Sequence, residues 1–191
     1  STLRAGTVER AYEFARRPAE LELELVEEPT EVKADTDVRA TILADRVALH
    51  AEIAYDVRRG KVHELAVTVP AGFALTQAPR GLDIREAPIV TDDAATGART
   101  IRMGLATGLA GQGRLVLDLE RPLTGEPTVT FPDVRPLGVA WETTAVSIAA
   151  AQGLRVRPQQ DPPGLQVRDV RSATRGQGAP AGTEWVLAYQ R

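Results

Sequence analysis

The chain has 191 residues, of which 43% are hydrophobic and 26% are charged, proportions typical of an ordinary folded protein. The net charge of −3, with basic and acidic residues interspersed, excludes nucleic acid as the main partner, because phosphate binding needs a clustered basic surface. The absence of cysteine excludes disulfides, thiol catalysis and cysteine-ligated metals. No apolar run reaches the roughly 18 residues that span a bilayer, so we expect no membrane insertion by this segment.

Alternation with a period of two begins near the N-terminus. Residues 20–25 place leucine at every second position and glutamate between them. This spacing puts the leucines on one face of a strand and the carboxylates on the other, whereas a helix would distribute them around its axis. The segment is therefore predicted to be a strand.

The clearest strand covers residues 46–58, in which six apolar residues occupy alternate positions. Residues 62–69 alternate in the same way, and Gly60 lies between the two segments. Glycine is the usual residue of tight turns. We therefore predict a long antiparallel hairpin that closes near Gly60.

Further strands are predicted around residues 82–84, 101–105, 115–119, 129–131 and 185–189, with turn residues between them. The glycine-rich residues 108–113 are interpreted as a hairpin connection, because they precede a strand and lack the Lys-Ser/Thr of a phosphate-binding loop. Residues 142–152 are ambiguous. Their alanines and the following Gly153 suit a short helix, but their β-branched residues favour a strand, which we prefer.

These elements predict an all-β fold: a large antiparallel β-sandwich of about twelve strands with little or no helix. We expect residues 1–191 to form a single domain. The alternative is a looser C-terminal subdomain from about residue 132, where proline and glycine become more frequent. Because the chain starts at Ser1 without an initiator methionine, we interpret it as part of a longer protein.

No pattern indicates a catalytic or cofactor site. His50 and His63 would lie far apart along the predicted hairpin, so a shared metal is not expected. No Gly-x-Ser-x-Gly motif is present. No pair of carboxylates stands beside an aromatic-lined cleft motif, as glycosidic catalysis would require. We therefore predict that the chain is not an enzyme and carries no cofactor.

Two groups of residues are candidates for binding, one for calcium and one for a ligand. Asp35, Asp37, Asp92 and Asp93 form short acidic clusters in what we read as loops, and they are the weak candidates for calcium, although solvated turns explain them as well. Most aromatic residues alternate with leucine or valine and are expected in the core. Trp141 and Tyr12 are the remaining candidates for contact with a ligand.

The expected function is that of a non-catalytic structural or protein-interaction module of a larger bacterial protein, in the cell envelope or outside the cell. Its expected partners are other domains of that protein or separate proteins, reached through a sheet edge. The alternative is a glycan- or ligand-binding module, or an accessory domain of a carbohydrate-active enzyme.

Overall fold

The computed structural model describes residues 30–125, 128–129, 131–160 and 162–191. The strand predicted at residues 20–25 and the candidate Tyr12 lie outside these residues. The all-β prediction is confirmed: the described chain contains nine strands and one four-residue helix, α1 (Val170–Ala173). No helix among the described residues is long and apolar enough to cross a membrane.

All nine strands belong to one mixed sheet. Their bounds, in chain order, are β1 (Glu31–Ile42), β2 (Arg46–Val69), β3 (Ala74–Leu75), β4 (Ile89–Asp92), β5 (Arg99–Pro122), β6 (Arg135–Pro136), β7 (Trp141–Ala151), β8 (Gln166–Val167) and β9 (Thr183–Gln190). The main path through the sheet is β3-β5-β2-β1-β7-β9-β8, while β4 pairs with β5 and β6 pairs with β2. The sandwich of about twelve strands is thus not confirmed.

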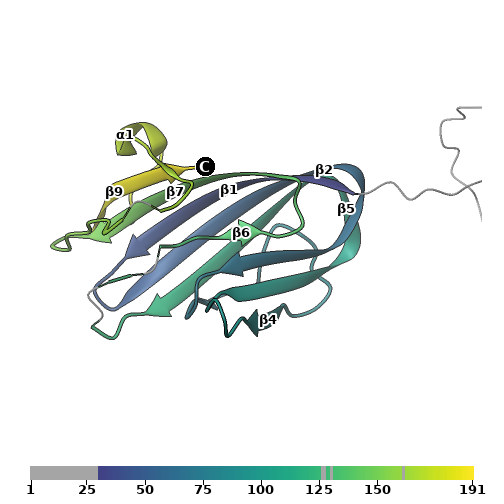
Figure 1. Ribbon diagram of the computed structural model, residues 1–191, viewed down its shortest axis with the longest axis horizontal. Coiled ribbons are helices and arrows are strands. Elements are labelled where there is room, and N and C mark those ends of the chain that lie inside the picture. The colour runs from purple at the N-terminus through teal and green to yellow at the C-terminus, as the bar shows by residue number, and fades with distance from the viewer. Residues whose placement is uncertain (1–29, 126–127, 130, 161) are drawn as a thin grey trace, which may run out of the picture.

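The predicted hairpin at Gly60 is wrong, and so is the connection predicted at residues 108–113. β2 and β5 each run unbroken for 24 residues through these glycines and pair with each other along both halves. Gly60 adopts a φ of 71°, and the pairing shifts register between Val57 and Val62. The glycines therefore bend two paired strands together instead of reversing either one, and Figure 1 shows the pair curving back on itself.

The preference for a strand over a helix at residues 142–152 is confirmed, since β7 covers nearly all of them. β7 pairs with β1 in parallel, from Lys33 opposite Trp141 to Ile42 opposite Ala150. This parallel pair corrects the expectation of a purely antiparallel sheet. It arises because the chain crosses over between β5 and β7 before it rejoins the sheet beside β1.

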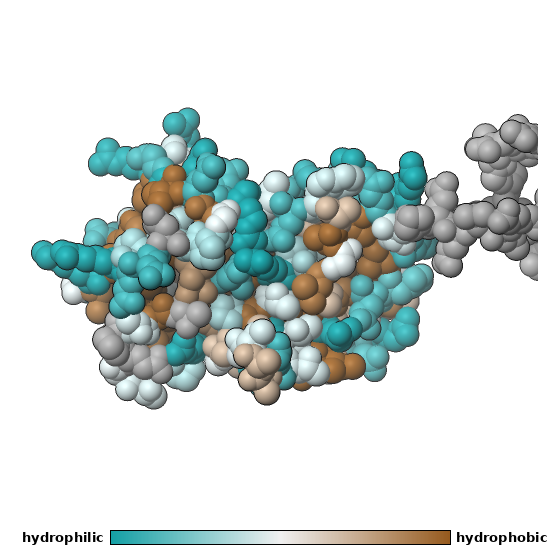
Figure 2. Space-filling model, viewed as in Figure 1, coloured by the Kyte–Doolittle hydropathy of each residue, from teal (hydrophilic) through white to brown (hydrophobic). Residues whose placement is uncertain are grey.

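We call the apolar side of the sheet the inner face and the polar side the outer face. The inner face forms one continuous core to which both halves of the bent β2–β5 pair contribute. Its largest fully buried side chains are Phe73, Ile53, Ile101, Met103, Leu105, Leu115, Leu117 and Leu119, with Val38, Val47, Val67 and Val69. The bend thus wraps one sheet around a single core. In the view of Figure 2, hydrophilic residues are interleaved with small apolar patches on the outside.

Candidate functional site

A row of interlocked charges crosses the outer face over β2 and β5. His50 lies directly opposite Asp118 in the ladder, and its Nδ1 is 2.7 Å from Asp118 Oδ1. Its Nε2 is 3.1 Å from Oε1 of Glu52, two residues along the same face of β2. Arg80 donates to Asp118 at 2.5 Å, and Arg114 donates to Glu52. We call Arg80, Asp118, His50, Glu52 and Arg114 the charge ladder.

The charge ladder limits what His50 can do chemically. A general base needs a ring nitrogen that is free to accept a proton from a substrate. Both ring nitrogens of His50 lie within hydrogen-bond distance of carboxylates, and each carboxylate is also held by an arginine. The arrangement therefore suits a structural role, in which these side chains hold β2 and β5 together.

His63 lies at the bend, where its ring stands next to Gly108 on the neighbouring strand. A β-carbon added to Gly108 would meet the His63 ring at 2.5 Å, so the two residues fit closely together. Among residues 30–191 that the structure describes, no group of three or more histidine, aspartate and glutamate side chains is placed to hold a metal ion.

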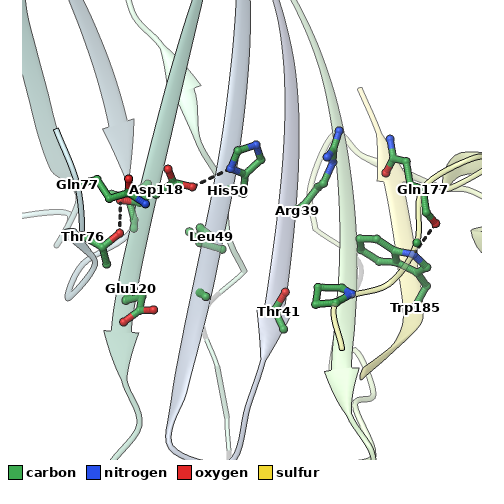
Figure 3. Close-up of a pocket in the computed structure, with 14 residues that line it drawn as sticks. Arg39, Thr41, Leu49, His50, Thr76, Gln77, Asp118, Glu120, Gln177 and Trp185 are labelled. Carbon is green, nitrogen blue, oxygen red and sulfur yellow. Dashed lines mark hydrogen bonds and ion pairs between the residues drawn. The ribbon is translucent and has the colours of Figure 1, made fainter. Parts of the chain in front are cut away.

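A depression in the outer face, with a volume of about 460 Å³, overlaps the charge ladder at His50 and Asp118, and we call it the outer-face depression. Its floor comes from β1, β2 and β5, with Arg39, Thr41, His50 and Glu120 among its residues. Two loop segments form its walls, residues 76–77 on one side and residues 177–180 on the other. Figure 3 shows Trp185 beside the second wall, with its indole nitrogen bonded to the Gln177 carbonyl.

The first pair of calcium candidates lies in a strand, which corrects the interpretation that they occupy a loop. Asp35 and Asp37 project from the outer face of β1. Asp35 accepts hydrogen bonds from Thr143 and Lys33, and the bond from Thr143 is the main reason that its pKa lies below the ordinary value of 3.8. Asp37 pairs with Arg39 at 3.5 Å. Both carboxylates therefore have partners within the sheet.

The second pair lies at the end of β4 and in the turn that follows it. Asp92 pairs with Arg99 through two hydrogen bonds of 2.6 and 2.9 Å, which lower its pKa. Asp93 accepts from the Thr96 hydroxyl and the Ala95 amide, and these bonds lower its pKa as well. The two carboxylates fasten the turn between β4 and β5.

Of the two ligand candidates, only Trp141 can be placed. It begins β7 on the outer face, is 55% exposed, and lies 5.8 Å from the Arg58 guanidinium. It does not line the outer-face depression. Trp185 does line it, whereas its alternation with leucine predicts a core position. No sequence signal marks this role, because it depends on residues 177–180 folding beside β9.

Tyr55 is one of the buried polar residues on the inner face. Tyr55 is almost fully buried, and burial raises the pKa of its hydroxyl, with a smaller contribution from the Glu142 carboxylate. Among the described residues its hydroxyl oxygen has no hydrogen-bond partner.

Comparisons with known proteins show little. No protein-family model matches the sequence, and no curated protein matches it. One similar solved structure is an M1 zinc metallopeptidase from Deinococcus radiodurans, an E323A mutant bound to a Tyr-Ser-Ala substrate. It is 14% identical with a TM-score of 0.42, and the match covers 84% of this chain and 39% of that chain. The chain thus spans well under half of the metallopeptidase, and so weak a likeness carries no conclusion about function.

Proposed function

We propose that this chain is a non-catalytic interaction module within a longer protein and that it docks an extended segment of a partner protein along β4. The observation that carries the proposal is the exposed apolar edge at this strand. Ile89 is 60% exposed and Val90 is 45% exposed, and β4 pairs only with β5 among the described strands. Figure 1 shows β4 at the margin of the molecule.

The backbone of β4 supports the same role. The amide of Asp93 donates to the carbonyl of Ala98, which fixes the phase of the β4–β5 ladder. Because hydrogen-bonded and non-hydrogen-bonded pairs alternate along an antiparallel ladder, the backbone groups of Val90 and Asp92 point away from β5. Such groups can pair with an added strand, and exposed β-branched side chains can pack on it.

The charge ladder supports the non-catalytic part of the proposal. Its charged groups are matched one to another across β2 and β5, and the histidine is held on both sides. A surface of this kind stabilises the sheet, while an edge or a loop contacts the partner protein.

Photocrosslinking in the full-length protein tests the edge. A photoreactive residue at position 90 should give one discrete adduct in producing cells, and mass spectrometry should map it to an extended segment of the partner. The adduct should disappear when Ile89→Lys is added, because a lysine at a strand edge opposes pairing. The same photoreactive residue at Leu154, another exposed apolar position, is the control. Failure to obtain a discrete adduct at position 90, or its survival with Ile89→Lys, would refute docking along β4.

The outer-face depression favours a second candidate function, that of a ligand-binding module. This depression combines an indole ring with hydroxyl, amide and guanidinium groups. Ligand sites commonly join apolar surface to a few placed polar groups in this way.

A further inference from the structure

The outer-face depression contains hydrogen-bonding groups that the fold does not use. The side-chain oxygen of Gln177 is shielded from solvent and has no hydrogen-bond partner among the described residues, and the Nε of Arg39 has only the Asp37 carboxylate, 3.5 Å away. Buried polar groups usually find a partner, so such atoms mark a place where one is missing. Both residues line the same depression.

Arg39 is also the cation in the depression with the most unused hydrogen-bond donors. Its one contact within the described chain is the ion pair from Nε to Asp37 at 3.5 Å, so its two terminal nitrogens are available. The acids nearby are already occupied, because Asp118 is held by Arg80 and Glu120 lies 3.6 Å from Arg46. A free guanidinium fork matches a carboxylate through two parallel hydrogen bonds.

Trp185 supplies the apolar part of the depression. Its indole N–H already donates to the Gln177 carbonyl at 3.3 Å, so the ring offers its carbon surface and not its donor to a ligand. A sugar ring has a C–H face that packs on an indole and hydroxyl groups that pair with amides and guanidinium groups. Figure 3 shows Trp185 and Gln177 on one side of the depression, Gln77 on the other, and Arg39 on the floor between them.

The backbone around the depression argues against a peptide. The strands of its floor, β1, β2 and β5, have neighbours on both sides, so the floor offers no free strand edge. β5 is covered by β3 and by the bonds that link Thr76 and Arg80 to it. A peptide that binds by adding a strand needs a free edge. A glycan needs side chains alone, which the depression provides.

We propose that the outer-face depression binds an acidic glycan, with a sugar ring packed on Trp185 and a sugar carboxylate held by Arg39. The inference rests on the ligand-binding candidate function and is independent of docking along β4. Gln177 supplies an acceptor for a sugar hydroxyl at the same wall.

Calorimetric titration of the 191-residue chain with defined oligosaccharides tests the proposal. The probes are oligogalacturonate, oligoalginate and hyaluronan fragments, with galacto- and cello-oligosaccharides as neutral counterparts. At least one acidic probe should bind, and its neutral counterpart should bind at least tenfold more weakly. Trp185→Leu and Arg39→Gln should each weaken binding of the acidic probe at least tenfold. Arg39 is the safer of the two for folding, because a third of its side chain is exposed.

Trp141→Leu is the matched control, since it removes an exposed tryptophan from the same face outside the depression. It should leave the affinity unchanged. The proposal is overturned if no acidic probe binds, if the neutral probes bind equally well, or if Trp141→Leu abolishes binding while Trp185→Leu does not. A crosslink at position 90 would persist in any of these cases, so the failure of one proposal is distinguishable from the failure of the other.

Discussion

The two faces of the sheet are built from the same alternating strands but are held together in different ways. On the inner face, buried aliphatic side chains from β1, β2, β5 and β7 meet in one core. On the outer face, charged side chains pair across strands, as Asp118, His50 and Glu52 do. Burial of apolar surface stabilises contact between almost any two apolar side chains. An ion pair, in contrast, forms only with one particular partner in one register of the strands. The inner face should therefore carry most of the stability, and the outer face should specify the pairing of the strands.

The largest expected effect belongs to the inner face. Leu117 is fully buried in the second half of β5, so Leu117→Ala should lower the free energy of unfolding by about 3 kcal/mol, through lost burial and a residual cavity. Its neighbour Val116 points to the outer face, and Val116→Ala should cost less than about 1 kcal/mol. Urea denaturation of both variants measures the contrast. Equal losses would contradict the assignment of stability to one face.

The next effect belongs to the charge ladder. Asp118→Ala removes the partner of both His50 and Arg80, and it should cost about 1–2 kcal/mol because its hydrogen bonds are partly shielded. A double-mutant cycle with His50→Ala should give a coupling energy of about 1 kcal/mol. Chemical denaturation of the four proteins at pH 6 gives this value. A coupling energy near zero would mean that the ladder does not fasten β2 to β5.

A smaller effect should appear as a pH dependence. The hydrogen bond from Thr143 holds the pKa of Asp35 below its ordinary value of 3.8 in the folded protein. The stabilisation from this carboxylate is therefore fully present above that value and is lost as the pH falls below it. Asp35→Asn should lose less stability than the wild type between pH 6 and pH 3.

Thr143→Val removes the main cause of the lowered pKa, so it should flatten the same pH profile. Urea midpoints measured at each pH compare the three proteins. If both variants follow the wild-type profile, the bond between β1 and β7 contributes nothing to acid sensitivity.

The smallest effect is expected at Tyr55, whose polar hydroxyl lies on the apolar inner face. Tyr55 places a hydroxyl on the inner face, and that hydroxyl has no hydrogen-bond partner among the described residues. Tyr55→Phe should therefore change the free energy of unfolding by less than about 0.5 kcal/mol, or raise it, because no bond is lost. Thermal and urea unfolding measure the change. A loss above about 1.5 kcal/mol would show that the hydroxyl is bonded in solution.

The sequence predicts the inner face well, because alternation depends only on the pleat of a strand. The buried positions of β2, from Val47 to Val57, follow the predicted pattern without exception. The strand at β7 and the strand at β9 were also predicted. Alternation cannot distinguish a turn from a bend, however, and this is why the pattern predicts a hairpin at Gly60. That distinction depends on the partner strand, which comes from a distant part of the chain.

The outer face shows the limit of the same reasoning. Asp35 and Asp37 look like loop acids in sequence, but β1 passes through them. His50 and Asp118 are separated by 68 residues, so nothing local indicates that they pair. Trp185 lines the outer-face depression only because residues 177–180 fold beside it. Each of these features is set by register or by loop packing, neither of which a single sequence shows.

The bent β2–β5 pair also has a consequence for how the chain folds. A hairpin at Gly60 would have joined neighbouring residues, whereas the observed ladder joins Val69 to Arg99 at its near end and Arg46 to Pro122 at its far end. Closing such loops loses chain entropy before the contacts form, so folding should be slow, in the millisecond-to-second range of proteins rich in non-local pairing. Zippering from the Val69–Arg99 end closes the shortest loop first. The loop between β2 and β5 would then govern the folding rate.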